Sequence, residues 1–175
     1  MRITISGTIG SGKSTVASIL SKMTGFKVFS GGYFFRKAAD DHGMTVEEFN
    51  RFLESDPTFD TDLNNAIKEF LADNDNIIVE SRLIGWLSWR GKIPAFRVFL
   101  DADIDERVRR VQKRDSSEET RNLLIDREES EVKRFREFFN IDFSDKRIYD
   151  LVLNTDSITA EEASRRIYDM VNANR

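Results

Sequence analysis

The segment GTIGSGKST, residues 7–15, constrains the fold of this chain more than any other segment. It matches the pattern G-x-x-x-x-G-K-[ST], in which a glycine-rich turn points successive backbone N–H groups at one anion where a helix begins. Ile3 and Ile5 precede it as a short strand. An apolar helical face with the spacing i, i+3, i+4, i+7 follows it, formed by Val16, Ile19, Leu20 and Met23. A strand, this loop and a helix together predict a phosphate-binding site.

Every residue of the segment is predicted to bind a nucleotide: Gly7, Thr8, Ile9, Gly10, Ser11, Gly12, Lys13, Ser14 and Thr15. Lys13 is expected to bridge the β- and γ-phosphates of ATP or GTP, which makes it a candidate catalytic residue. The Ser14 hydroxyl is expected to bind Mg²⁺. Glu80, at the end of a later strand, is the candidate that holds the same ion through water; a turn or helix-cap carboxylate is its alternative role.

Short apolar runs alternate with helical patterns along the chain. Further strands are predicted at 27–30, 76–80, 96–100 and 150–155. Helices are predicted at 31–41, 46–54, 59–72 and 117–139. One more helix is predicted directly after the fourth strand, and another at the end of the chain. This alternation predicts an α/β fold, a doubly wound parallel sheet of about five strands with helices on both faces. The long helical insertions after the second and fourth strands are where moving parts are expected.

Composition limits the class of protein. A chain of 175 residues suits one domain, and its net charge of −4 argues against a nucleic-acid partner. The absence of cysteine excludes disulfides and thiolate metal sites and fits a reducing compartment. No apolar run reaches the length of about 18 residues that spans a membrane, and the N-terminus does not resemble a signal peptide. We therefore expect no membrane partner and a cytoplasmic location.

Charged residues gather in two sets at helical spacing. The first set consists of Arg107, Arg110 and Arg114, and the second of Arg127, Glu131 and Arg134. Guanidinium groups with a carboxylate between them suit a ligand that carries both phosphate oxygens and hydroxyls. The alternative is an exposed helix with Glu–Arg pairs on its surface.

Two more arginines stand where a parallel sheet binds ligands. Arg82 follows the third strand, and Arg36 lies about one turn into the helix after the second strand. In open α/β sheets ligands gather beyond the carboxyl ends of the strands, so both are candidate phosphate ligands. Their alternative role is to cover apolar surface.

The sequence offers many arginines but no obvious catalytic base. Its one histidine, His42, stands at the expected end of a polar helix, where a capping or solvent-facing role is expected. A hydroxyl acceptor usually needs a base, whereas a phosphate oxygen is already anionic. This asymmetry favours transfer between two phosphates, driven by positioning and charge neutralisation.

Several segments, in this order, resemble the archaeal-type cytidylate kinases of the P-loop nucleoside monophosphate kinases: GTIGSGKST, SGGYFFR, VESRLIGW, IPAFRVFLDA, REESEVKRFREFFNID and YDLVLNT. The resemblance runs from Met1 to about Thr155. It implies a single three-layer P-loop NTPase domain over 1–175, with a helical monophosphate-binding region at about 36–72 and a lid at about 113–128. It also implies an enzyme that uses ATP and Mg²⁺ to convert CMP, and dCMP, to the diphosphate. We expect a monomer.

The resemblance assigns roles to the arginines. It implies that Arg36, Arg82 and Arg134 grip the monophosphate, and that Arg127 and Glu131 face the ribose and phosphate of CMP. Arg110 and Arg114 would lie on the lid side near the transferring phosphoryl group. The expected catalytic residues are therefore Lys13, Arg110, Arg114 and Arg134.

One position departs from the family pattern. An acidic residue is expected in G-[DE]-x-x-R before Arg36, and this chain has Tyr33 there. Tyr33 could stack on the acceptor base or, as is more usual for an aromatic residue, pack in the core. No spacing selects cytosine over uracil or adenine. A kinase for another monophosphate or a small hydroxyl acid, and an ATP-dependent assembly or RNA-maturation factor, remain the alternatives.

Overall fold

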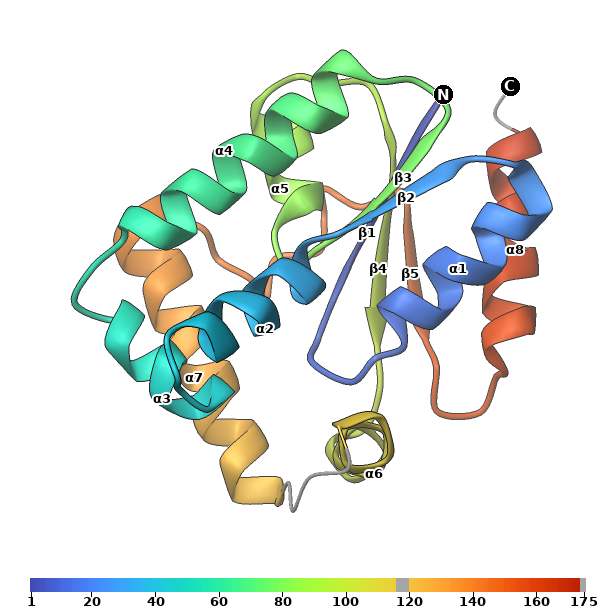
Figure 1. Ribbon diagram of the computed structural model, residues 1–175. Coiled ribbons are helices and arrows are strands. Elements are labelled where there is room, and N and C mark those ends of the chain that lie inside the picture. The colour runs from blue at the N-terminus through green and yellow to red at the C-terminus, as the bar shows by residue number, and fades with distance from the viewer. Residues whose placement is uncertain (116–119, 174–175) are drawn as a thin grey trace.

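The phosphate-binding segment follows the central strand of a five-stranded parallel sheet, whose strand order is β2-β3-β1-β4-β5 (Figure 1). This computed structural model describes residues 1–115 and 120–173. The strands are β1 (Arg2–Gly7), β2 (Lys27–Ser30), β3 (Ile77–Glu80), β4 (Phe96–Asp101) and β5 (Leu151–Asn154). The predicted α/β fold with about five parallel strands is confirmed.

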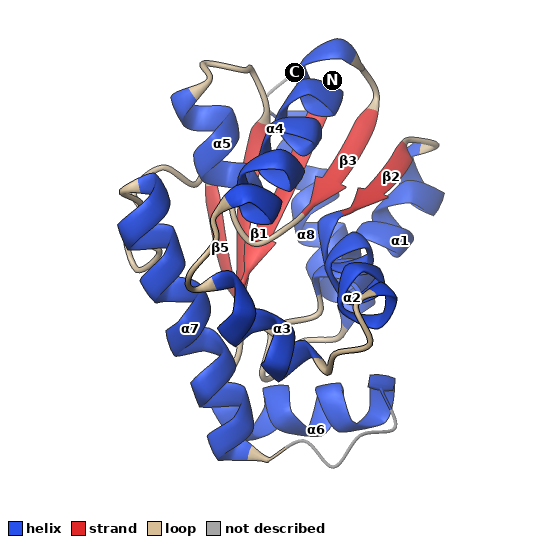
Figure 2. Ribbon diagram, turned by 60° about the vertical axis from the view of Figure 1, so that its left-hand side comes forward, coloured by secondary structure: helices blue, strands red, loops and turns tan. Residues whose placement is uncertain are grey.

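Helices cover both faces of the sheet. They are α1 (Lys13–Thr24), α2 (Gly31–Asp41), α3 (Val46–Leu53), α4 (Thr58–Asp73), α5 (Ile84–Arg90), α6 (Ile104–Asp115), α7 (Arg121–Phe139) and α8 (Ala160–Ala173). Helices α1 and α8 lie on one face, and α4, α5 and α7 lie on the other (Figure 1). Helices α2, α3 and α6 stand beyond the carboxyl ends of the strands, where the sequence places the site (Figure 2).

The core follows from strands that are buried on both faces. In β3 every side chain is buried, because Ile78 packs with α1 and α8 while Ile77 and Val79 pack with α4 and α5. A continuous apolar run is the sequence pattern of such a central parallel strand. Register then brings polar side chains together at the carboxyl edge, since Ser30 of β2 pairs with Glu80 of β3.

Local signals set the helix ends. Thr45 and Glu48 form the capping box that begins α3, and the Ser30 hydroxyl begins α2 by accepting a hydrogen bond from the backbone N–H of Tyr33. Helix α7 begins later than the predicted 117–139, with Thr120 as its N-cap; positions 117–119 lie outside the described residues. Helix α5 was not predicted, because its seven residues are too few to show a helical period.

Tyr33 contradicts the expectation of a core position. Its side chain is 56% exposed and contacts Phe34 edge-on, with ring centroids 5.4 Å apart. The predicted monophosphate-binding region covers α2, α3 and α4, and the predicted lid joins the end of α6 to the start of α7. Within the described part of the chain, no helix has the length and apolar character needed to cross a membrane.

Candidate active site

A cavity of about 510 Å³ lies at the carboxyl edge of the sheet. Its walls come from the phosphate loop, helices α2, α3 and α4, the end of β3, and helices α6 and α7. The predicted site residues that line it are Ile9, Gly10, Gly12, Lys13, Ser14, Thr15, Arg36, Glu80, Arg82, Arg110, Arg114, Arg127, Glu131 and Arg134. Gly7, Thr8 and Ser11 belong to the same loop but do not line the cavity. The folded chain thus gathers residues that the sequence could only group by pattern.

Two glycines of the phosphate loop adopt a left-handed backbone conformation. Gly10 has φ +78° and Gly12 has φ +95°, in the left-handed region that costs other residues energy. A Cβ atom on Gly10 would also stand 2.7 Å from the backbone oxygen of Arg107. Gly12 is the N-cap of α1, so the loop leads directly into the positive end of that helix. This geometry suits a bound phosphate group.

Lys13 folds back on its own loop. Its ammonium group donates to the backbone oxygens of Thr8, at 2.8 Å, and Gly7, at 3.2 Å. Burial, and then the positive charge of Arg82, lower the pKa of Lys13 to about 7. Because this environment disfavours the charged ammonium group, an anionic partner would stabilise that group strongly.

Ser14 and Glu80 lie together, as the magnesium prediction requires. The Ser14 hydroxyl donates to Oε1 of Glu80 at 2.9 Å, and the Ser30 hydroxyl donates to the same oxygen. Both side chains offer the hard oxygen atoms that Mg²⁺ prefers. No cluster of three or more His, Cys, Asp or Glu side chains that could hold a metal occurs in residues 1–115 and 120–173. The donor set therefore fits an ion that takes its other oxygens from phosphate and water.

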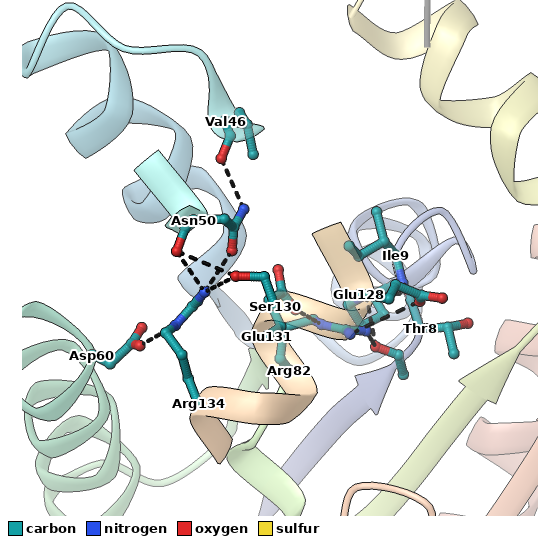
Figure 3. A network of polar contacts seen from close by, with 12 residues as sticks. Thr8, Ile9, Val46, Asn50, Asp60, Arg82, Glu128, Ser130, Glu131 and Arg134 are labelled. Carbon is teal, nitrogen blue, oxygen red and sulfur yellow. Dashed lines mark hydrogen bonds and ion pairs between the residues drawn. The ribbon is translucent and has the colours of Figure 1, made fainter. Parts of the chain in front are cut away.

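Arg82 connects the phosphate loop to α7. Its Nε donates to Glu131 at 2.5 Å (Figure 3). Its Nη1 donates to the backbone oxygen of Gly7, and its guanidinium carbon lies 4.6 Å from the ring centroid of Phe143. Nη2 is buried and has no hydrogen-bond partner in the described structure. Glu131 is buried, yet its pKa is lowered, because the charges of Arg82 and Arg134 outweigh the effect of burial. Nη2 lies 3.9 Å from Oε1 of Glu128, so Arg82 faces carboxylates of α7 on two sides.

Arg134 is almost completely enclosed, with 1% of its surface exposed. Its Nε donates to Asp60 at 2.7 Å, and its Nη1 donates to the backbone oxygen and side-chain Oδ1 of Asn50 and to the Ser130 hydroxyl (Figure 3). Burial raises the pKa of Asp60 despite this ion pair. The contacts tie α7 to α3 and α4, and they leave only Nη2 without a hydrogen bond in the described structure.

The remaining arginines differ in how strongly the protein holds them. Arg110 donates to the side chain and backbone oxygen of Thr155, both at 2.8 Å. Arg114 pairs with Asp115 at 2.5 Å, and the buried Arg127 lies 3.5 Å from Glu47. Arg36 makes no hydrogen bond or ion pair within the described structure, and burial, then the charge of Arg114, lower its pKa.

The residues of this site that sequence reasoning missed include Asp60, Asn64, Glu128 and Thr155. Asp60 and Asn64 stand at i and i+4 on one face of a helix that was itself predicted, so their shared face was readable. Thr155 directly follows β5, at the ligand-binding edge of the sheet. Glu128 carried no such signal, because its contact with the phosphate loop joins positions 119 residues apart.

Known proteins resemble this chain along almost its whole length. Residues 2–157 match the cytidylate kinase-like family. A cytidylate kinase from Thermoplasma volcanium is 46% identical over 166 residues, covering 94% of this chain and 87% of that protein. A cytidylate kinase from Natronomonas pharaonis is 42% identical over 175 residues, covering 99% of this chain and 90% of that protein.

Solved structures share the fold. A shikimate kinase from Acinetobacter baumannii superposes with a TM-score of 0.68 over 99% of this chain and 94% of that chain. Its sequence identity is 14%, so the likeness concerns the fold alone.

Proposed function

This chain belongs to the cytidylate kinase-like family, and on that premise we propose that it transfers the γ-phosphoryl group of ATP to CMP, and to dCMP, giving ADP and the nucleoside diphosphate. One observation carries the proposal. A single cavity joins the phosphate loop to arginines of α2, of the turn after β3 and of α7, so it can hold a donor and an acceptor phosphate side by side.

The chemistry requires little beyond position and charge. An oxygen of the acceptor phosphate attacks the γ-phosphorus, and the bond from that phosphorus to the bridging oxygen of ADP breaks. Lys13 would turn from its loop oxygens to the β- and γ-phosphates of ATP. Arg36 and Arg82 would hold the acceptor phosphate, and Arg127 would lie beside it. No base is needed, because the attacking oxygen already carries a negative charge.

Ser14 and Glu80 would hold a magnesium ion, which when bound offsets the negative charge of the ATP phosphates. Arg110 and Arg114, on α6, would stabilise the transferring group from the lid side. We propose that the region 36–72 and the lid at 113–128 close on the two substrates. Closure would exclude water, which would otherwise accept the phosphoryl group from ATP.

We propose that the enzyme is a monomer, as expected from the sequence. A cytoplasmic location stays a prediction from the sequence.

The test is an ADP-release assay with Mg-ATP and each of CMP, dCMP, UMP, AMP and GMP, and with no acceptor. Lys13→Ala serves as the blank. Release that is strongest with CMP or dCMP supports the proposal. ADP release only with another monophosphate would overturn the assignment of CMP as the acceptor. ADP release at the same rate with and without every acceptor would overturn the assignment of kinase activity.

A further inference from the structure

The hydroxyl group of Ser30 makes two contacts that point toward the two halves of the site. It donates to Oε1 of Glu80, the carboxylate proposed for magnesium, and it accepts from the backbone N–H of Tyr33 at 3.2 Å. Tyr33 belongs to the first turn of α2, which directly follows β2 (Figure 1), and the same helix carries Arg36. Glu80 and Arg36 line the cavity, whereas Ser30 is not among the described residues that line it. Any effect of Ser30 on a ligand must therefore act through its partners.

The chemistry of the three groups fixes the direction of both hydrogen bonds. A serine hydroxyl has one hydrogen atom and two lone pairs. A backbone N–H can only donate and an ionised carboxylate can only accept, so the hydroxyl hydrogen must point at Glu80. Two hydrogen bonds in series also strengthen each other. Ser30 therefore holds Oε1 of Glu80 in one place, and the other oxygen, Oε2, makes no hydrogen bond within residues 1–115 and 120–173.

Ser14 holds the same oxygen in a different way. Its hydroxyl donates to Oε1 of Glu80 at 2.9 Å, but Ser14 is itself a proposed ligand of the ion, so its position depends on what is bound. Ser30 is instead fixed by its strand, because it pairs with Glu80 in the register of β2 and β3. The contact of Ser30 with Glu80 should therefore be the same with and without the ion.

Two glycines let the start of α2 approach the end of β3. A Cβ atom on Gly31 would lie 2.7 Å from Cβ of Ser81, so the first residue of α2 packs directly on the chain after Glu80. A Cβ atom on Gly32 would lie 3.3 Å from Nη1 of Arg36, so that guanidinium group lies over the first turn of its own helix. A shift of this first turn would therefore move Arg36.

From these contacts we infer that Ser30 is a positioning residue for phosphoryl transfer. It holds Glu80 with Oε2 free to face the magnesium site, and by capping α2 it places Arg36 for the acceptor phosphate. The inference rests on the proposed function, and it connects the donor side of the site to the acceptor side through one hydroxyl group. Loss of that group should weaken the binding of both the metal and the acceptor.

The first test measures the metal without the reaction. Mn²⁺ is titrated into the protein in the presence of a smaller amount of ADP, and the free ion is followed by its electron paramagnetic resonance signal. We expect Ser30→Ala to raise the Kd of Mn²⁺ in this complex roughly three- to tenfold, the value of one hydrogen bond. Ser30→Thr keeps the hydroxyl group and should restore the affinity. Equal Kd values for the unaltered protein and Ser30→Ala would overturn the inference.

The second test asks whether the effect on the acceptor passes through Arg36. We expect Ser30→Ala to raise KM for CMP roughly three- to tenfold in the otherwise unaltered protein. In a protein that already carries Arg36→Ala, the same substitution should raise KM for CMP no further, because the group that Ser30 places is gone. The Kd of Mn²⁺ should still rise in this double variant. Additive effects on KM would overturn the link from Ser30 to Arg36.

A merely structural role for the helix cap predicts a different pattern. Ser30→Ala would then lower stability and leave the Kd of Mn²⁺ unchanged. Thr159→Ala is the matched control, because the Thr159 hydroxyl accepts from the backbone N–H of Glu162 at 3.1 Å at the start of α8. This control should lower Tm by a similar amount, since it too removes a cap, and should change neither the Kd of Mn²⁺ nor KM for CMP.

A second variant keeps the test decisive if Ser30→Ala does not fold. Ser30→Gly also removes the contact with Glu80, but glycine is nearly as good a helix cap as serine. A raised Kd of Mn²⁺ in Ser30→Gly would support the inference, and an unchanged Kd would overturn it. Failure of the proposed function would be seen separately, as an unaltered protein that transfers no phosphoryl group to any monophosphate, because the Mn²⁺ titration needs only bound ADP.

Discussion

The carboxylate of Glu128 on α7 accepts a hydrogen bond from the backbone N–H of Ile9, in the phosphate loop, at 3.2 Å. The same oxygen lies 2.7 Å from Nη1 of Arg107, a buried arginine that also donates to the backbone oxygens of Ile9 and Ala102. The phosphate loop is therefore held from outside the nucleotide site by one carboxylate and one guanidinium. Helices α6 and α7, which the predicted lid at 113–128 overlaps, are joined to the loop at this point.

We expect Glu128→Ala to weaken ATP binding, although Glu128 lies outside the nucleotide site. The substitution leaves the Arg107 charge uncompensated and the Ile9 N–H without its partner, which should cost roughly 3–5 kcal/mol of stability. KM for ATP should rise several-fold more than KM for CMP. Glu129→Ala, at an exposed neighbouring position, is the control. Equal KM values in the Glu128 variant and the control would contradict this coupling.

The pKa of Lys13, lowered to about 7 by burial and then by Arg82, makes ATP binding depend on pH. Phosphates favour the charged ammonium, so the pKa must rise when ATP binds. Above pH 7 the free protein therefore takes up a proton on binding, and affinity falls: Kd should be about fivefold larger at pH 8 than at pH 7. Calorimetry at pH 8 in buffers of different ionisation enthalpy measures the uptake. Binding of ATP without proton uptake would show that Lys13 is already charged.

Arg36 makes no hydrogen bond or ion pair within the described structure, so its loss should affect ligand binding and leave stability unchanged. We expect Arg36→Ala to raise KM for CMP roughly ten- to hundredfold, the value of a charge-assisted contact. The free energy of unfolding should change by less than about 0.5 kcal/mol. Arg51→Ala, an exposed arginine on α3, is the matched control. A large loss of stability with unchanged KM would assign Arg36 a structural role.

Arg134 should behave in the opposite way. Arg134→Ala leaves the buried Asp60 carboxylate without its cation, which should cost roughly 3–5 kcal/mol and lower Tm by roughly 6–20 °C. The neighbouring Lys133→Ala removes only an exposed pair with Glu54, worth less than about 1 kcal/mol. Scanning calorimetry of the two variants makes the comparison. Similar Tm values would mean that the Arg134–Asp60 pair does not hold α7 to α4.

The sequence predicted what short-range patterns carry. The phosphate loop, the hydrophobic runs of the strands and the Thr45–Glu48 capping box all depend on residues within a few positions of one another. The fold and most element boundaries followed from these patterns. So did the neighbourhood of Ser14 and Glu80, because parallel strands end at the same edge of the sheet.

Other features depend on contacts that no local pattern encodes. The buried pair of Arg134 and Asp60 joins positions 74 apart in the sequence, so only the folded chain brings the two together. Tyr33 was expected in the core because aromatic residues usually bury, yet it lies on the outer face of α2. Helix α5 is too short for its period to show.

The most direct test of the proposed function follows the γ-phosphate itself. ATP labelled at that phosphate is incubated with the protein, Mg²⁺ and CMP, and the label in CDP and in inorganic phosphate is measured. We predict that the label appears in CDP in equal amount to the ADP formed, and that little phosphate is released. Label that enters inorganic phosphate at the same rate with or without CMP would contradict a cytidylate kinase.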